Sequence, residues 1–330
     1  MGVESLTPNP HSGGGPPPPA TAAHVHLPEM VGVLARETTI PGNSMTGTLA
    51  VRPRVTVDSV HESLLETARS IALEAGELAA RRRREGVTVA ASKSSSVDIV
   101  TEADRETEAL IRGRLAEVRP GDGFFGEESG AERGTSGLTW VVDPIDGTVN
   151  FLYGIPHYAI SIAVVEGDPD PLTWTALAGA VLNPATGELF TATRGGGAFL
   201  GEQRLSVSPP VELAQALVGT GFAYDSGMRG RQGALIAALL PRVRDIRRMG
   251  TASLDLCGVA AGRLDAYFER TLSPWDHAAG ALVAREAGAT VKGKGAEAPS
   301  REFILAAHPQ VAEALEELLG YLDTKTVRAG

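Results

Sequence analysis

The spacing of apolar residues predicts a long helix that begins near residue 59. Ser59 and Glu62 have the spacing of a capping box, in which each side chain bonds the other residue's backbone N–H. Apolar side chains then recur at helical spacing along one face, at Val60, Leu64, Ile71 and Leu78. The pattern runs into four arginines at 81–84 and stops at Gly86. We interpret these arginines as cations at a helix C-terminus, with nucleic-acid binding as the alternative.

Short strands and helices alternate after this helix, and glycine or proline separates many of them. A helix is predicted over 102–118, and strands are predicted over 87–91, 124–125, 140–142, 160–165, 177–182 and 189–193. From about 206, helices are predicted near 230–240, 252–262, 277–288 and 309–319, and strands near 217–222, 244–248, 265–269 and 302–306. The pattern predicts an α/β or α+β chain with two sheets.

The first 57 residues lack this periodicity. They include consecutive glycines at 13–15 and consecutive prolines at 16–19, a composition that cannot offset the entropy of ordering a chain. We predict a disordered extension over 1–57, with an extended piece near 48–57; a proline-rich ligand for a partner domain is the alternative. The remainder is predicted to form an N-terminal metal-binding sub-domain over 58–205 and a C-terminal sub-domain over 206–330.

Composition and charge narrow the function. The chain has 330 residues, of which 43% are hydrophobic and 21% charged, as in ordinary globular proteins, and its formal net charge is −10. Nucleic acids and anionic membranes are polyanions, so neither is expected as the main partner. The single cysteine, Cys257, excludes an internal disulfide and a cysteine-built zinc site. We see neither a transmembrane segment nor a secretory signal, and a cytoplasmic enzyme or binding protein is therefore predicted.

The segment 140–151 carries the most informative chemistry. An apolar strand leads into Asp143 and Asp146, with Pro144 between them and Gly147 after them. Proline restricts the backbone before it and glycine permits a tight turn, so both carboxylates can converge on one point. Two carboxylates repel one another unless a proton or a cation lies between them. Oxygen-only ligands favour Mg²⁺, Mn²⁺ or Ca²⁺ over zinc.

Three further acidic elements have a similar placement. Glu127 and Glu128 follow a predicted strand, Asp276 opens a predicted helix after Pro274, and 98–104 runs from a strand end into a helix cap. Each carboxylate alone could be an N-cap or turn residue. Together they are typical of a multi-metal site for phosphoryl transfer.

These elements resemble the signatures of the inositol monophosphatase family. Asp143-Pro-Ile-Asp-Gly-Thr-Val-Asn-Phe151 resembles its first signature and Trp275-Asp-His-Ala-Ala-Gly280 its second. The other matching segments are 93–98, 101–104, 126–129 and 250–253, in the family's order, and the resemblance covers roughly 60–320. It implies a layered αβαβα sandwich of the inositol monophosphatase and fructose-1,6-bisphosphatase type. It also implies a site between the two sub-domains and a homodimer.

The resemblance implies a Mg²⁺ site of two to three ions, with Mn²⁺ as a substitute. Glu127, Asp143 and the backbone carbonyl of Ile145 resemble the ligands of the tightest ion. Asp143, Asp146 and Asp276 resemble the ligands of the second.

Catalytic and substrate roles follow from the same resemblance. Asp104 and Glu127 would assist a third ion. Lys93 matches a lysine of the family that lies near a mobile loop beside this ion. Asp104 and Thr148 resemble the pair that orients and deprotonates the attacking water. The implied substrate contacts are Asp146, Gly147, Thr148, Gly250, Thr251, Ala252, Glu269 and Asp276, of which Gly147 and Thr148 hold the phosphate through backbone N–H groups.

The predicted reaction is hydrolysis of a phosphate monoester by direct in-line attack of metal-activated water, without a phosphoenzyme. Segments 244–257 and 265–269 resemble inositol monophosphatases most, and myo-inositol 1-phosphate is the predicted substrate. Histidinol-phosphate phosphatase and fructose-1,6-bisphosphatase are the alternatives, because few contacts to the alcohol decide the substrate. The non-enzymatic alternative is a regulatory protein of the same fold that binds transcription or ribosome machinery. Ser273 departs from the family pattern, which often has histidine or another polar residue at this position. The loop 220–225 has no clear counterpart in that pattern.

Weaker signals have simpler interpretations. Glycines 195–197 lack the spacing of a nucleotide loop and predict a hairpin turn. Cys257 is expected to be a buried small apolar residue. His157 and His277 are interpreted as packing groups beside the site, and Tyr267 as part of the core or of the site wall.

Overall fold

The structure is a computed structural model that describes residues 56–87, 89–92 and 99–329. The predicted disorder of residues 1–55 and the predicted role of Lys93 concern residues outside the described ranges. The described residues belong to one compact unit. In the described part of the chain, no helix is both long and apolar enough to cross a membrane.

Two sheets dominate the fold. The first has the strand order β10-β9-β8-β7-β6-β5-β3-β4, and only β3 and β5 pair in parallel. Its strands are β3 (Gly123–Gly126), β4 (Gly130–Glu132), β5 (Leu138–Asp146), β6 (Ala159–Glu166), β7 (Thr175–Asn183), β8 (Glu188–Thr193), β9 (Gly197–Leu200) and β10 (Gln203–Arg204). β1 (Val89–Ser92) and β2 (Ile99–Thr101) form a separate antiparallel pair.

The second sheet has the order β12-β11-β13-β15-β14, in which β11 pairs in parallel with β12 and β13 and the other pairs are antiparallel. Its strands are β11 (Leu217–Thr220), β12 (Asp245–Arg247), β13 (Ala266–Glu269), β14 (Thr290–Lys292) and β15 (Ile304–Ala307). The α-helices are α1 (Val57–Glu85), α2 (Glu102–Val118), α3 (Thr148–Tyr153), α4 (Ser226–Leu239), α5 (Ala252–Ala260), α6 (Pro274–Glu286) and α7 (Pro309–Ala329), and η1 (Leu213–Gln215) and η2 (Leu240–Arg242) are 3₁₀ turns.

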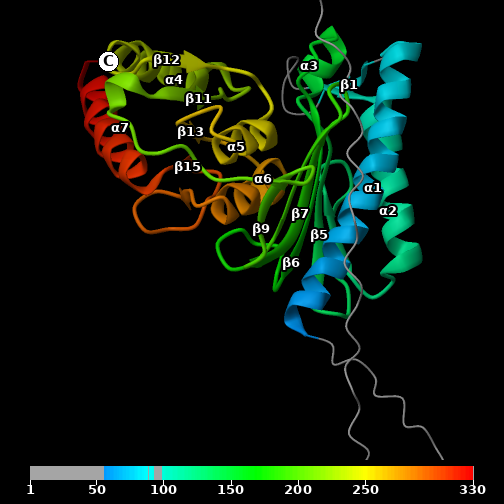
Figure 1. Cartoon of the computed structure of the whole chain (residues 1–330). Coiled ribbons are helices and arrows are strands. Elements are labelled where there is room, and N and C mark those ends of the chain that lie inside the picture. The colour runs from blue at the N-terminus through cyan, green and yellow to red at the C-terminus, as the bar shows by residue number, and fades with distance from the viewer. Residues whose placement is uncertain (1–55, 88, 93–98, 330) are drawn as a thin grey trace, which may run out of the picture. The chain divides into compact units, whose positions relative to one another are not determined.

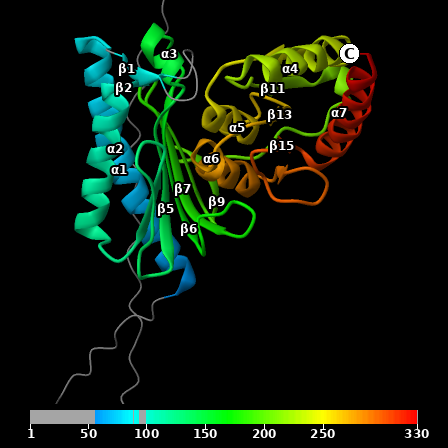
Figure 2. The same cartoon turned by 180° about the vertical axis from the view of Figure 1, so that it is seen from behind.

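Four apolar cores join these elements into five layers. α1 and α2 cover one face of the first sheet, and α5 and α6 cover its other face (Figure 1). The opposite sides of α5 and α6 pack on the second sheet. α4 and α7 cover the outer face of that sheet, as the view from behind also shows (Figure 2). The predicted αβαβα sandwich is therefore confirmed.

The first helix begins earlier than the sequence predicts. Thr56 is the N-cap of α1, and its side chain and that of Ser59 form the capping box. The prediction that Ser59 pairs with Glu62 is wrong, because Thr56 supplies the same hydroxyl chemistry one turn earlier. Its C-terminal arginines are helical, and Arg82 bonds Glu85 and Glu106, which supports the interpretation of a charged helix end.

Most other predicted elements are present with shifted ends. The helix over 102–118 is α2 with the same bounds. The strands β4, β9, β10 and β14 are missing from the prediction, because segments of two to four residues carry little periodic signal. The predicted boundary at 205/206 falls between β10 and η1, and the division into two sub-domains stays a prediction.

The central helices pack closely because glycine faces the contact. A Cβ on Gly280 of α6 would lie 2.9 Å from the backbone oxygen of Ser253 and 3.0 Å from Leu256 Cβ, both in α5. Since α6 also carries Asp276 in its first turn, this contact fixes one candidate ligand relative to the residues of α5.

We expect Gly280→Ala to lower the free energy of unfolding by up to about 2 kcal/mol. Alanine gains about 1 kcal/mol in helix propensity over glycine, but overpacking costs about 1–3 kcal/mol here. The matched control is Gly320→Ala in α7, where nothing outside the adjoining residues and the nearby helix backbone lies within 4 Å of the added Cβ, and this variant should be stabilised. Urea unfolding measures both, and stabilisation of both variants would contradict the close packing.

Candidate active site

A cleft of about 930 Å³ gathers most of the predicted site residues. The first sheet and α3 supply Glu127, Asp143, Ile145, Asp146, Gly147 and Thr148, and the second half of the chain supplies Gly250, Thr251, Ala252, Glu269 and Asp276. Asp104 does not line the cleft, because it is fully buried behind Thr148. The fold thus brings together segments that are far apart in sequence.

The end of β5 presents the central pair of carboxylates. The pairing of β5 with β6 is regular to Asp143, shifts register there, and resumes at Asp146. Proline cannot donate to a ladder, so Pro144 belongs at such an irregularity. Asp143 also accepts a hydrogen bond from the backbone N–H of Ile145, at 3.1 Å. Asp143 is 1% exposed and Asp146 8% exposed, so both carboxyl groups are largely withdrawn from water.

Gly147 connects β5 to α3 in a way that only glycine allows. Its φ is +90°, and a Cβ there would overlap the hydroxyl oxygen of Thr251. Thr251 itself donates to the backbone oxygen of His157, at 2.8 Å. The sharp turn places Thr148 at the start of α3, where backbone N–H groups lack intrahelical acceptors.

Asp104 and Thr148 form a buried hydrogen-bonded pair. The Thr148 hydroxyl lies 3.1 Å from Asp104 Oδ1 and 3.1 Å from the Ile145 carbonyl oxygen. The other oxygen of Asp104 accepts from the backbone N–H and hydroxyl of Thr101, the N-cap of α2. Burial raises the pKa of Asp104 to about 7, although the hydrogen bonds from Thr101 oppose this shift.

Asp276 is held by the cap of α6. Ser273 is the N-cap residue, and its backbone N–H donates to Asp276 Oδ2 at 2.6 Å. The neighbouring Trp275 packs edge-to-face against Phe125 of β3, with ring centroids 5.3 Å apart. The helix end is thereby anchored to the first sheet beside Glu127.

Burial and mutual repulsion dominate the electrostatics of the cleft. Burial, followed by the charges of Glu127, Asp146 and Asp276, raises the pKa of Asp143 well above its usual value. Burial and the charges of Asp146 and Glu127 have the same effect on the pKa of Asp276. Burial raises the pKa of Asp146 to about 6, against the opposing hydrogen bonds from Ser253.

Two polar residues of the site had no role in the sequence prediction. The backbone N–H and hydroxyl of Ser253 both donate to Asp146 Oδ2, at 2.7 and 2.6 Å. Asn150 donates through Nδ2 to the backbone oxygens of His157 and Met249, at 2.7 and 2.8 Å. Both residues lie inside the motifs that resemble the family signatures. Their position in these motifs is the one feature of the sequence that could have indicated a role in the site.

The donor set suits a hard cation. Carboxylates and one backbone carbonyl offer only oxygen, the donor that Mg²⁺, Mn²⁺ and Ca²⁺ prefer. A cation between these groups would also relieve the repulsion that raises their pKa values. Within the described ranges, no group of three or more histidine, cysteine, aspartate or glutamate side chains is arranged so that it could hold a metal ion as it stands. Asp146 and Asp276 instead direct an oxygen at Ser253 and Ser273.

Gly250, Thr251, Ala252 and Glu269 also line the cleft. Burial raises the pKa of Glu269 to about 7, while the Tyr267 hydroxyl and the positive charge of Arg248 oppose the shift. These four residues combine backbone groups, a hydroxyl and one carboxyl group, which suits an alcohol more than a second metal ion.

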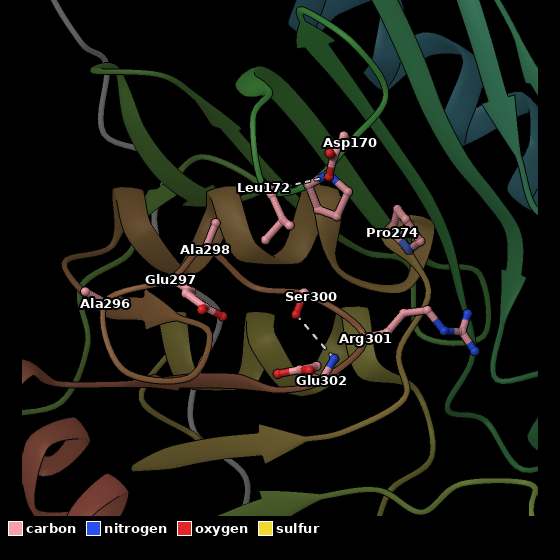
Figure 3. Close-up of a pocket in the computed structure, with 10 residues that line it drawn as sticks. Asp170, Leu172, Pro274, Ala296, Glu297, Ala298, Ser300, Arg301 and Glu302 are labelled. Carbon is pink, nitrogen blue, oxygen red and sulfur yellow. Dashed lines mark hydrogen bonds between the residues drawn. The ribbon is translucent and has the colours of Figure 1, made fainter.

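A second cavity, of about 840 Å³, lies between the loop near Asp170 and the loop 296–302. Figure 3 shows its lining residues, with the Arg301 side chain extending away from the others. Arg301 also lines the cleft, and its guanidinium donates to Ser273 Oγ at 2.9 Å. None of the predicted site residues lines this second cavity.

Comparison with known proteins decides the family. The sequence model described as "Inositol monophosphatase family" matches residues 60–322. The chain belongs to the inositol monophosphatase family. The match contains every predicted site residue, including Lys93.

Individual relatives agree with this assignment. The chain is 45% identical over 279 residues to the inositol-1-monophosphatase of Mycobacterium leprae, which covers 78% of this chain and 94% of the relative. It is 38% identical over 258 residues to the Nus factor SuhB of Xylella fastidiosa, at 75% and 91% coverage. The solved structure of Mycobacterium tuberculosis SuhB matches with a TM-score of 0.67 and 42% identity, over 79% of this chain and 97% of that chain.

We expect Glu269→Gln to raise the free energy of unfolding more at pH 8 than at pH 5. The pKa of Glu269 rises from 4.5 to about 7 on folding, so the folded state resists ionisation of this group. Stability is therefore lost as pH rises from about 4.5 to 7, by at most about 3 kcal/mol. Glutamine removes that dependence.

Urea unfolding of both proteins at the two pH values, in chelator, measures the difference. Glu313→Gln, at an exposed position of α7, controls for the amide substitution itself. An equal effect of Glu269→Gln at both pH values would contradict the raised pKa.

Proposed function

We propose that this protein is a Mg²⁺-dependent phosphate monoester hydrolase whose substrate is myo-inositol 1-phosphate. The observation that carries the proposal is the convergence of Glu127, Asp143, Asp146 and Asp276 on one cleft that Thr148 also lines. The chain belongs to a family of phosphatases, whose members are generally metal-dependent. The specific metal, the number of ions and the residue roles are the parts we propose.

Glu127, Asp143 and the Ile145 carbonyl would hold one Mg²⁺, and Asp143, Asp146 and Asp276 a second. Asp104 and Glu127 would assist a third ion, beside Lys93, and Mn²⁺ would serve as a substitute. When bound, these ions lower the pKa of water and neutralise the charge on the leaving oxygen. The acidic, oxygen-only donor set of the cleft supports this assignment.

Asp104 and Thr148 would orient the attacking water. Thr148 Oγ1 accepts a proton from the water while its own proton moves to Asp104 Oδ1, 3.1 Å away. The raised pKa of Asp104, about 7, suits a general base near neutral pH. The attack is direct and in line, and Cys257 is fully buried and cannot serve as a nucleophile.

The remaining residues would bind the substrate. The backbone N–H groups of Gly147 and Thr148 hold the phosphate at the start of α3. Gly250, Thr251, Ala252 and Glu269 hold the alcohol, and Asp146 and Asp276 contact it from the metal side. The relative from M. leprae is named an inositol-1-monophosphatase, which supports inositol phosphate as the substrate. Histidinol phosphate and fructose 1,6-bisphosphate are the alternatives with the same metal site.

The wider proposal is a cytoplasmic homodimer that acts on a small molecule. The net charge of −10 favours a small phosphate ester with metal ions over a nucleic-acid partner. The resemblance to the family supports the homodimer.

A second candidate function is regulatory binding by the same fold. The relative from X. fastidiosa is named a Nus factor, which is the observation that favours it. Loss of cellular function in an Asp143→Asn variant that keeps its fold would support catalysis, and full retention would support binding.

The direct test is phosphate release with Mg²⁺ from inositol 1-phosphate, histidinol phosphate and fructose 1,6-bisphosphate, compared by kcat/KM. We expect a preference for inositol 1-phosphate, and a fall of more than about a hundredfold in Asp143→Asn because an ion loses its ligand. Circular dichroism checks that the variant is folded. A preference for either other ester would reject the substrate, and release that is independent of Mg²⁺ would reject the mechanism.

A further inference from the structure

Glu269 lines the cleft from a constrained position. It is the last residue of β13, which lies between β11 and β15 inside the second sheet. Tyr267 is two residues earlier on the same face of the strand, is fully buried, and donates its hydroxyl to Glu269 Oε2 at 2.5 Å. One oxygen of the carboxylate is therefore fixed by a rigid phenol.

The neighbouring strand confines the carboxylate from the other side. Gly221 follows β11 immediately, and the parallel register of β11 and β13 brings it beside Glu269. A Cβ at Gly221 would overlap the whole carboxyl group of Glu269. The φ of Gly221 lies outside the left-handed region, so the requirement for glycine here is one of space.

The second oxygen of Glu269 remains available to the cleft. Oε1 accepts no hydrogen bond from any residue within the described ranges, whereas Oε2 is held by Tyr267. Glu269 and Gly221 both line the cleft. Arg248 lines it as well; burial raises the pKa of Glu269 to about 7, and the positive charge of Arg248 opposes that rise.

We propose that Tyr267 and Gly221 are positioning residues that leave Glu269 Oε1 as a fixed acceptor for one hydroxyl group of the substrate alcohol. The proposal rests on the proposed function, in which Glu269 contacts the alcohol. A site built to bond a hydroxyl discriminates strongly against esters that lack it, because its buried polar group is then unpaired. Tyr267 and Gly221 therefore determine specificity for polyol phosphates without touching the phosphate.

The test compares Tyr267→Phe with the wild-type protein on two esters. Inositol 1-phosphate offers hydroxyl groups to Glu269, whereas p-nitrophenyl phosphate offers none. We expect kcat/KM for inositol 1-phosphate to fall about tenfold, mostly through KM, because the lost interaction holds the substrate in both ground and transition states. For p-nitrophenyl phosphate, kcat/KM should stay within about twofold of wild type.

Three further variants keep the proposal falsifiable. Tyr158→Phe removes a hydroxyl from another buried tyrosine, outside the cleft, and should change neither ester. Gly221→Ala should reproduce the pattern of Tyr267→Phe by displacing the same carboxylate. In a Glu269→Ala background, Tyr267→Phe should have no further effect on inositol 1-phosphate. Equal falls on both esters, or no change on either, would overturn the proposal.

Failure of the proposed function would give a different result. If wild type prefers histidinol phosphate or fructose 1,6-bisphosphate, the substrate is wrong, and the preferred ester replaces inositol 1-phosphate in the same comparison. Selective loss of that ester in Tyr267→Phe would still support the positioning role. A wild-type protein with no preference for any of these esters over p-nitrophenyl phosphate would overturn the positioning role itself.

Discussion

Repulsion among buried carboxylates is the constraint on which the rest of this structure depends. Asp143 is 1% exposed, and its pKa is raised by burial and by the charges of Glu127, Asp146 and Asp276. Such a group of charges destabilises the folded chain unless the surrounding layers hold it in place. A cation that binds among the carboxylates only in the folded state would stabilise that state by mass action.

Local hydrogen bonds hold two of these carboxylates, Asp146 and Asp276, in place. Ser253 bonds Asp146 from the first turn of α5, and the Ser273 cap bonds Asp276 at the start of α6. Because α5 and α6 pack closely on one another and between the two sheets, the bonds from Ser253 to Asp146 link both halves of the chain, while the bond from Ser273 fixes Asp276 within the second half. The same frame places Glu269 in the cleft, so binding of the ester and of ions would share one scaffold.

Sequence patterns predict this site where the information is local. Pro144 and Gly147 indicate the bend that aims Asp143 and Asp146, and the periodicity of 102–118 gives α2 its bounds. Contacts between distant segments leave no such pattern: nothing near Asp146 indicates that Ser253, 107 residues later, will bond it. A local pattern also misleads where two similar residues could both cap a helix. Thr56 is the N-cap of α1, although Ser59 has the same hydroxyl chemistry.

The central claim is that these carboxylates form one site for divalent ions, and Mn²⁺ binding tests it most directly. Electron paramagnetic resonance of free Mn²⁺, titrated into chelator-treated protein, measures affinity without any substrate. The account predicts that wild type binds Mn²⁺, that Mg²⁺ competes, and that Asp143→Asn weakens binding by at least about tenfold. Equal Mn²⁺ affinity and stoichiometry in folded wild type and Asp143→Asn would contradict it.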